Sequence, residues 1–165
     1  LLQKALTKSF KVTDMKLKDK IPCYVFDLDG TLCNVSHRRQ WVATKPKNWD
    51  AWNAGISEDV PNAPVLDVLH TLSGSFRIVI VSGRGSEYRA QTEEWLKKYR
   101  ISYDNLYMRA DGDFRADDEI KSELADQVEK TYQIIGVFDD RKKVVDMWIK
   151  RGLFVFDVAQ GAGNF

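Results

Sequence analysis

The sequence predicts an α/β protein in which helices cover both faces of a Rossmann-like parallel sheet. From Ile21 onward, short apolar runs rich in β-branched and aromatic residues alternate with longer segments of helical character. The segments between these runs are long enough to hold a helix, as crossovers between parallel strands require. With 165 residues and 44% apolar content, the chain has enough material for one domain with a sizeable core.

The expected elements follow one another in regular order. Strands are placed on apolar runs such as Tyr24-Val25-Phe26 and Ile78-Val79-Ile80-Val81. The predicted order is strand 23–27, helix 63–72, strand 77–81, helix 87–99, strand 106–108, helix 117–130, strand 134–138, helix 142–150 and strand 154–156. Ligands of such sheets bind at the carboxyl ends of the strands, so the polar residues at these ends are the candidate site.

One long insertion interrupts this alternation. Residues 33–62 lie between the first strand and the first helix, and this stretch is too long for an ordinary loop. It contains Trp41, Trp49 and Trp52 together with four basic residues, so we expect a small helical cap beside the site. The tryptophans have two interpretations, since they can form the cap's own small core or stack on a substrate base.

The N-terminal segment differs from the rest of the chain. Residues 1–20 scatter six lysines and two aspartates among apolar residues, which predicts an extension or linker before a single domain over 21–165. Position 1 is Leu1 and not an initiator methionine, which suggests a fragment of a longer polypeptide, although processing explains it equally well.

Composition excludes several classes of protein. The 25 basic and 24 acidic residues nearly cancel, so no global field draws the chain to nucleic acid or to a membrane. No apolar run approaches the roughly 18 residues of a membrane span. Cys23 and Cys33 lack the spacing of a zinc site or of a disulfide scaffold. We therefore expect a soluble protein of the cytoplasm with no membrane partner.

Two carboxylates directly follow the first predicted strand, in the run Asp27-Leu28-Asp29-Gly30-Thr31. Alternation along the strand sends Asp27 and Asp29 to one side, and Gly30 lets the backbone turn sharply while its amide approaches an anion. The run therefore predicts a site for phosphate and a metal ion. Taken alone, it is more typical of a strand that ends in a solvated Asp-Gly turn.

Three later segments strengthen the phosphate interpretation. Ser82, Gly83 and Arg84 end an apolar strand with a hydroxyl, a backbone amide and a guanidinium, all of which donate to phosphate oxygens. Lys121 lies on a predicted helix with an acidic first turn.

The last of these segments places Asp139 and Asp140 directly after another buried strand. An acidic pair beside the first two aspartates requires a cation to offset the repulsion. The oxygen ligands favour Mg²⁺.

In this order, the four motifs resemble those of the haloacid dehalogenase (HAD) superfamily of phosphotransferases, and the second aspartate resembles its phosphatase branch. Within that branch, the chain is most similar to the 3′-phosphatase domain of phage-type polynucleotide kinase/phosphatase. The similarity rests on Ser82-Gly83-Arg84, on Gly112-Asp113-Phe114-Arg115-Ala116-Asp117-Asp118 before Lys121, on Phe138-Asp139-Asp140-Arg141 with Val144-Val145-x-Met147-Trp148, and on Val158-Ala159-Gln160-Gly161. No Gly-x-x-x-x-Gly-Lys-Ser/Thr occurs, so the 5′-kinase half of such enzymes is absent from this chain.

The resemblance implies a role for each motif. Asp27 would be the nucleophile that forms an aspartyl-phosphate, and Asp29 the general acid and base. Ser82 and Lys121 would stabilise the equatorial oxygens of the reacting phosphate. Mg²⁺ would be held by the Asp27 carboxylate, the Asp29 carbonyl and Asp139, with Asp140 as outer ligand or orienting group.

The resemblance also implies a substrate, a phosphorylated end of DNA or RNA. The residues expected to bind it are Thr31, Gly83, Arg84, Arg115 and Arg141. A phosphatase of small nucleotide or metabolite esters would share the catalytic residues and differ in the cap, and a noncatalytic binding module is a third possibility. A phage origin and a preceding kinase or other end-processing domain also fit the resemblance.

Overall fold

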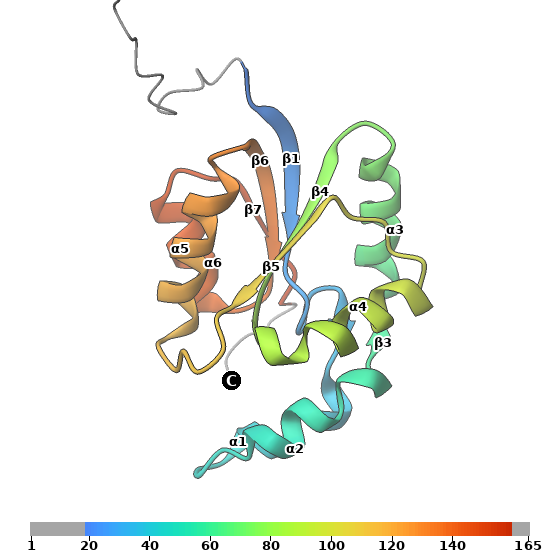
Figure 1. The fold of residues 1–165 in the computed structure, drawn as a ribbon, viewed down its shortest axis with the longest axis vertical. Coiled ribbons are helices and arrows are strands. Elements are labelled where there is room, and N and C mark those ends of the chain that lie inside the picture. The colour runs from blue at the N-terminus through green and yellow to red at the C-terminus, as the bar shows by residue number, and fades with distance from the viewer. Residues whose placement is uncertain (1–18, 160–165) are drawn as a thin grey trace, which may run out of the picture.

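A computed structural model describes residues 19–159 of the chain. Five strands form one parallel sheet in the order β5-β4-β1-β6-β7 (Figure 1). Their bounds are β1 Ile21–Phe26, β4 Arg77–Gly85, β5 Asn105–Arg109, β6 Tyr132–Asp139 and β7 Val155–Asp157. The predicted α/β class is confirmed. The extension expected at residues 1–20 lies almost wholly outside the described residues.

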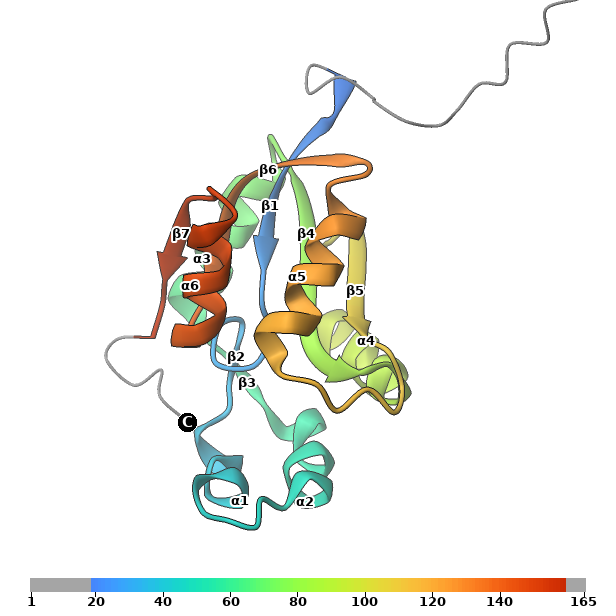
Figure 2. The same ribbon diagram turned by 90° about the vertical axis from the view of Figure 1, so that its left-hand side faces the viewer.

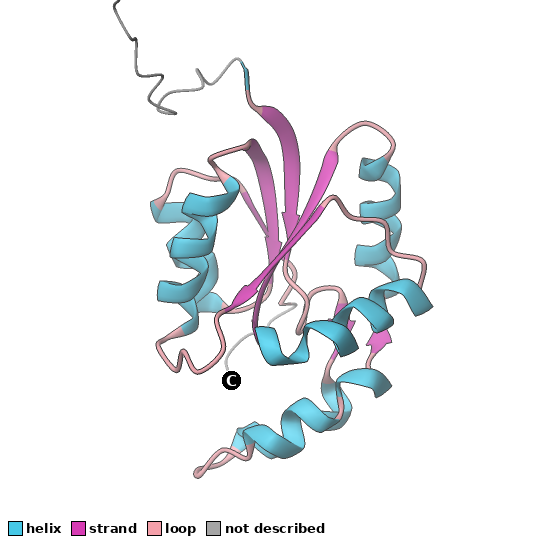
Figure 3. Cartoon of the chain, in the orientation of Figure 1, coloured by secondary structure: helices cyan, strands magenta, loops and turns pink. Residues whose placement is uncertain are grey.

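Helices cover both faces of the sheet (Figures 1 and 3). They are α3 Ala63–Ser73 and α4 Arg89–Lys98 on one face, and α5 Asp117–Val128 and α6 Lys142–Lys150 on the other. Each pair buries apolar residues against its own face, so the core has two layers. Leu69, Trp95 and Leu96 belong to the first layer, and Leu124 and Trp148 to the second. Right-handed crossovers between parallel strands produce this arrangement.

Alternation along the strands divides the sheet between the two layers. In β1, Phe26 faces the layer of α3 and α4, whereas Val25 faces the layer of α5 and α6. The rings of Phe26 and Phe138 stack at 4.4 Å between centroids, and Phe138 and Phe156 stack at the same distance. This stack crosses the three neighbouring strands β1, β6 and β7 one residue before β6 and β7 end.

The insertion at 33–62 folds as a small cap at the carboxyl end of the sheet, as expected (Figure 2). Its base is a two-stranded antiparallel ladder that the sequence did not predict. In order, the cap consists of β2 Cys33–Asn34, the 3₁₀ turn Ser36–Arg38, α1 Gln40–Ala43, α2 Trp49–Ala54, the 3₁₀ turn Ile56–Glu58 and β3 Val60–Pro61.

The three cap tryptophans differ in burial. Trp52 is buried together with Val42, so the small-core interpretation holds for it. Trp41 and Trp49 are 43% and 48% exposed, so these two rings remain largely accessible to solvent.

Several boundaries differ from those predicted, and two of these differences lie beside the candidate site. Strand β4 continues from Val81 to Gly85, because its pairing with β5 resumes at Gly85 and Arg109 after an irregularity. The following helix starts at Arg89 instead of Glu87, after a 3₁₀ turn over Ser86–Tyr88. The Ser82-Gly83-Arg84 segment is therefore extended and lies inside a strand. Within residues 19–159, no helix combines the length and apolar character needed to cross a membrane.

Candidate active site

The site lies where the strand order reverses. From β1 the chain builds β4 and β5 on one side of the sheet and then returns to build β6 and β7 on the other. The carboxyl ends of β1 and β6 therefore adjoin, with connections leaving in opposite directions, which opens a crevice above the sheet. Asp27 follows β1 and Asp139 ends β6, and both side chains are buried there.

Lys121 lies between these two carboxylates. Its Nζ is 2.8 Å from Asp27 Oδ1 and 2.9 Å from Asp139 Oδ2. Burial alone would lower the pKa of Lys121, but Asp139 and Asp27 hold it above its ordinary value. Burial raises the pKa of Asp27 well above its ordinary value; Lys121 opposes this rise, and Asp139 and Asp140 add to it. The ammonium is thus the protein's own counter-charge for a crowded acidic group.

Asp140 completes this acidic group. Carboxylate oxygens of Asp27, Asp139 and Asp140 all lie within 4.8 Å of one another. Burial, and then the charge of Asp139, raise the pKa of Asp140 to about 6. Three buried carboxylates whose oxygens lie this close together fit a hard divalent cation such as Mg²⁺.

The turn after β1 is built around Asp140. Thr31 Oγ1 donates to Asp140 Oδ1 at 3.4 Å, and both groups are buried. Gly30 has φ +95°, and a Cβ there would lie 2.1 Å from Asp140 Oδ2. Only glycine accepts this backbone conformation and this close approach without strain. Gly30 therefore lets the Asp27–Thr31 turn close against the end of β6.

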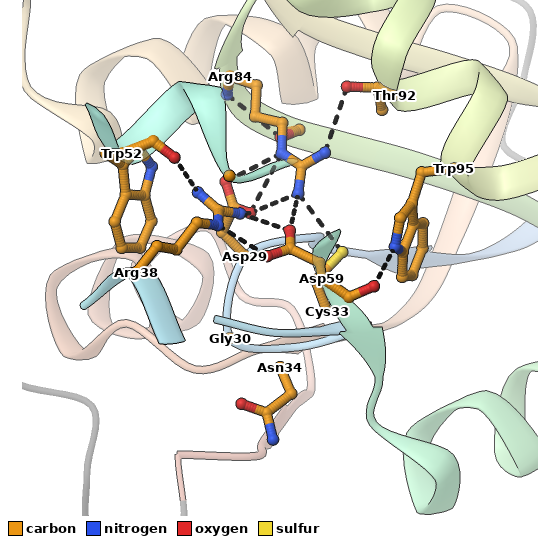
Figure 4. A network of polar contacts seen from close by, with 12 residues as sticks. Asp29, Gly30, Cys33, Asn34, Arg38, Trp52, Asp59, Arg84, Thr92 and Trp95 are labelled. Atoms are coloured by element: carbon orange, nitrogen blue, oxygen red, sulfur yellow. Dashed lines mark hydrogen bonds and ion pairs between the residues drawn. The ribbon is translucent and has the colours of Figure 1, made fainter. Parts of the chain in front are cut away.

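Asp29 belongs to a different cluster, which faces the cap (Figure 4). Its carboxylate accepts hydrogen bonds from Arg38 Nη2 at 2.5 Å and from Arg84 Nη2 at 2.6 Å. The same two guanidiniums bind the fully buried carboxylate of Asp59, at 2.6 Å from Arg38 Nη2 and 2.9 Å from Arg84 Nη2. The guanidiniums of Arg38 and Arg84 and the carboxylates of Asp29 and Asp59 thus alternate around a compact group of four charges, which we call the square.

The square fixes the charge state of Asp29. Burial would raise the pKa of Asp29, but Arg84 and Arg38 outweigh burial and hold it well below its ordinary value. Asp29, Cys33 and Asp59 also lie close enough to bind a metal ion, but guanidiniums already supply the positive charge between these groups. Asp29 is therefore an ionised acceptor in this structure.

The predicted phosphate loop lies beside Asp117. Ser82 is fully buried, and its Oγ accepts the backbone amide of Arg84 at 3.2 Å. A Cβ on Gly83 would lie 2.0 Å from Asp117 Oδ1, so glycine lets the end of β4 meet the first turn of α5. Lys121 Nζ is 3.8 Å from Asp117.

The three predicted substrate arginines differ in position. Arg84 is 4% exposed, and its guanidinium is bound within the cluster of Asp29 and Asp59. Arg141 is partly exposed, and its Nη1 donates to Asp117 Oδ2 at 3.2 Å. Arg115 lies on the surface, between Asp113 and Glu123. All three arginines line one cavity.

This cavity connects the site to solvent and has a volume of about 420 Å³. Asp27 and Asp29 contribute to its wall from the sheet, and the cap contributes Lys47, Trp49, Trp52 and Asn53. The remaining wall comes from the end of β4 and the 3₁₀ turn after it, from the loop between β5 and α5 with its flanking residues, and from Arg141. A ligand that reaches Asp27 must therefore pass between the cap and this loop.

Sequence reasoning did not single out four residues that shape the site, which are Arg38, Asp59, Arg109 and Asp117. The sequence did contain a signal for Asp117, because this residue precedes Lys121 by four positions and so lies on the same face of the helix. Arg38 and Asp59 are 21 residues apart and meet only because the cap folds back on itself. Arg109 ends β5 and donates to the Gly83 carbonyl at 2.8 Å.

A parallel sheet with helices on both faces, with carboxylates where the strand order reverses and a buried lysine between them, defines a phosphatase of the haloacid dehalogenase class. Such a phosphatase is a hydrolase. Comparison with known families refines this assignment. The chain belongs to the family of the polynucleotide kinase PNKP phosphatase domain, whose sequence model matches residues 21–165. The resemblance found in the sequence is thereby confirmed.

Related proteins agree with this assignment. A chain in the structure of a Pnkp1/Rnl/Hen1 RNA repair complex is 33% identical, with a TM-score of 0.74, over 96% of this chain and 47% of that one. A "Putative bifunctional polynucleotide kinase/RNA ligase" of Autographa californica nuclear polyhedrosis virus is 29% identical over 156 residues, covering 89% of this chain and 21% of the relative. The chain thus spans about a fifth of the viral protein and about half of the repair-complex chain.

A more distant structure shares the fold alone. The class C acid phosphatase from Bacillus anthracis, determined with tungstate bound, is 18% identical with a TM-score of 0.60, over 84% of this chain and 67% of that one.

Proposed function

We propose that this phosphatase removes the 3′-phosphate from DNA or RNA ends through an aspartyl-phosphate on Asp27. The observation that carries the proposal is the buried group of Asp27, Lys121 and Asp139, which lies where the strand order reverses, beneath a cavity open to solvent. A nucleophile needs a fixed direction of attack, and the contact from Lys121 holds one Asp27 oxygen in place. The other oxygen is then available for phosphorus.

In the first step, an Asp27 oxygen forms a bond to phosphorus while the bond from phosphorus to the 3′ oxygen breaks. The departing oxygen requires a proton, and Asp29 is the adjacent acid. Its two arginines keep Asp29 ionised when the site is empty. A bound phosphate dianion beside Asp29 raises the carboxyl's pKa by like-charge repulsion, which favours uptake of the proton that it then donates.

In the second step, water attacks phosphorus, and the bond to Asp27 breaks. Asp29, left ionised by the first step, accepts the proton of this water. Arg38 and Arg84 support this role because they stabilise and orient the carboxylate. Lys121 and the backbone amide of Gly83 donate to the equatorial phosphate oxygens, with Ser82 beside them.

The carboxylates of Asp27, Asp139 and Asp140, with the main-chain carbonyl of Asp29, would hold Mg²⁺. The cation would supply positive charge to the reacting phosphate and would orient it toward Asp27.

Two considerations support a polynucleotide end as the substrate. Arg115 and Arg141 line the same cavity as Asp27, and a reaction on one phosphate does not need both of these cations in addition to Lys121. The chain also belongs to a family of polynucleotide kinase phosphatase domains, and a related chain occurs in an RNA repair complex. We further propose that, in the full-length protein, this domain adjoins a kinase or other end-processing domain, and a cytoplasmic location stays a prediction.

The test is phosphate release from 3′-phosphorylated DNA and RNA oligonucleotides, compared with a panel of sugar and nucleotide phosphates. We expect much higher kcat/KM on the oligonucleotides, and binding that weakens with a steep log-log dependence on salt. A preference for a small ester, with a shallow salt dependence, would assign the enzyme to metabolite phosphatases instead.

A further inference from the structure

Phe114 is the most exposed large apolar side chain within residues 19–159, at 95% exposure. It lies in the loop between β5 and α5, and it lines the cavity that leads to Asp27. Single exposed apolar side chains are common on protein surfaces. Phe114 differs from these because it lines the cavity that leads to the candidate nucleophile.

The loop that presents Phe114 is held in place by Arg109. Its Nε donates to the Gly83 carbonyl at 2.8 Å, and its Nη1 donates to the carbonyls of Asp113 at 2.9 Å and Arg115 at 2.8 Å. Its Nη2 donates to Asp117 Oδ1 at 3.2 Å. The residues on both sides of Phe114 are thus bound to one guanidinium, and the ring projects from a braced loop. Such preorganisation lowers the entropic cost of binding.

The cap places further aromatic groups on the wall of the same cavity. Trp49 is 48% exposed, and Tyr88 also contributes to the lining. Phe114 and Trp49 are exposed, so aromatic surface lies toward the opening of the cavity, whereas Asp27 is a buried part of its wall. A ligand that suits both parts carries a phosphate at one end and a flat, apolar ring at the other.

We propose that Phe114 is the stacking platform for the base of the 3′-terminal nucleotide, with Trp49 of the cap as a second aromatic wall. The proposal rests on the proposed function and adds the subsite that recognises the nucleoside. Arg115 and Arg141, which line the same cavity, fit a polyanionic strand and would repel a basic partner. Stacking on an aromatic ring accepts every base, so the subsite selects nucleic-acid ends without selecting their sequence.

The test compares two 3′-phosphorylated oligonucleotides that differ only in the last nucleotide, which carries a base or is abasic. For Phe114→Ala, we expect kcat/KM on the base-bearing end to fall about tenfold or more, equivalent to about 1.4 kcal/mol. On the abasic end, which has no ring to stack, the change should stay below about twofold. Phe114→Trp should retain activity on both substrates.

A matched control is Phe154→Ala, since Phe154 is also exposed but does not line the cavity. This variant should behave as the parent protein on both ends. A second readout uses 2-aminopurine as the terminal base, bound to the Asp27→Asn protein. Its fluorescence should be quenched on binding, and the quenching should be lost when Phe114→Ala is added.

Equal losses on both ends, or no loss on either, would overturn the stacking subsite while leaving the 3′-phosphatase activity in place. Unquenched 2-aminopurine in the Asp27→Asn protein would have the same meaning. Failure of the parent protein to dephosphorylate either oligonucleotide would instead overturn the proposed function, and the subsite with it.

Discussion

A single ammonium balances the acids at the floor of the site. Lys121 is buried and bonds to both Asp27 and Asp139, so its charge is part of the folded structure as well as of the reaction. Buried carboxylates that lose their partner are left uncompensated in a medium that solvates them poorly. The stability of this site therefore depends on a cation that balances these carboxylates, either the Lys121 ammonium or an added metal ion.

Replacing Lys121 by methionine keeps the length of the side chain and removes its charge. In metal-free buffer, we expect Lys121→Met to lower the free energy of unfolding by about 3–5 kcal/mol, the usual effect of breaking a buried ion pair. Added Mg²⁺ should recover part of this loss. Urea denaturation measures both effects, and Lys130→Met, on an exposed lysine, is the control. A change within the error of the control would show that the ammonium is not needed for folding.

The Asp27→Asn substitution tests the nucleophile. The amide has the shape of the carboxylate but cannot form an acyl-phosphate at a useful rate, so turnover should be abolished. The fold should persist, because the substitution also removes one charge from a crowded acidic group. Phosphate release and the thermal midpoint measure the two effects. Residual activity within about tenfold of the parent, about 1.4 kcal/mol in barrier, would exclude Asp27 from this role.

The sequence allowed some residues of the site to be located but left the surroundings of others undetermined. Asp27 and Asp139 could be placed because each follows an apolar run that becomes a central strand. The environment of Arg84 could not be inferred, since Asp59 reaches its guanidinium from the far end of the cap. Contacts between residues so far apart in sequence carry no local pattern.

At the scale of elements, the cap is tied to the sheet through the base of its ladder. Asp59, just before β3, binds Arg38 of the cap and Arg84 of β4. Its carbonyl accepts a hydrogen bond from Trp95 Nε1 of α4 at 2.7 Å. The cap, the sheet and a covering helix therefore meet at one residue.

Asp59→Asn should separate this structural role from catalysis. The amide leaves two buried guanidiniums sharing the charge of Asp29, and we expect the free energy of unfolding to fall by about 3–5 kcal/mol. Asp50→Asn, on the exposed surface of α2, should change it by no more than about 0.5 kcal/mol. Chemical denaturation of both variants gives the comparison, and equal stability of the two would mean that the square does not hold the cap.

The two loops that carry Arg115 and Arg141 provide a test of substrate recognition. Changing either arginine to alanine should weaken binding of a 3′-phosphorylated oligonucleotide by about 1–3 kcal/mol, the value of a charge-assisted hydrogen bond. Hydrolysis of a small aryl phosphate should change much less. Arg77→Ala, at the opposite end of β4, is the control, because Arg77 pairs with Asp104 away from the cavity. Equal losses on both substrates would favour a small-molecule phosphatase.

The elements themselves were largely predictable, and the exceptions have physical causes. The predicted helix at 142–150 matches α6, in which Val144, Val145 and Trp148 recur at helical spacing and face the core. The end of β4 was placed too early because its pairing with β5 depends on Arg109, far along the chain. The cap ladder of β2 and β3 has two residues in each strand, which is too short for alternation to be recognised.

At the scale of the whole molecule, we expect activity to depend on a divalent metal ion. We expect chelation with EDTA to abolish activity and Mg²⁺ to restore it, because Asp27, Asp139 and Asp140 are oxygen donors that otherwise repel one another. Ca²⁺ should inhibit, since its longer and looser coordination displaces the phosphate from Asp27. Phosphate release in metal-buffered solution measures each effect. Full activity after exhaustive chelation would contradict the metal-dependent mechanism.

The stacked phenylalanines have a consequence for the choice of cation. Phe26, Phe138 and Phe156 each immediately precede an aspartate, so the aromatic stack and the row of acids share the same register across three strands. The main-chain atoms of Asp27 and Asp139 are therefore held at the hydrogen-bonded spacing of neighbouring strands, about 4.8 Å. A bound ion can turn the two carboxylates, but it cannot move these strands apart without parting the stacked rings. The foundation under two of the proposed metal ligands is thus set by the aromatic core before any ion binds.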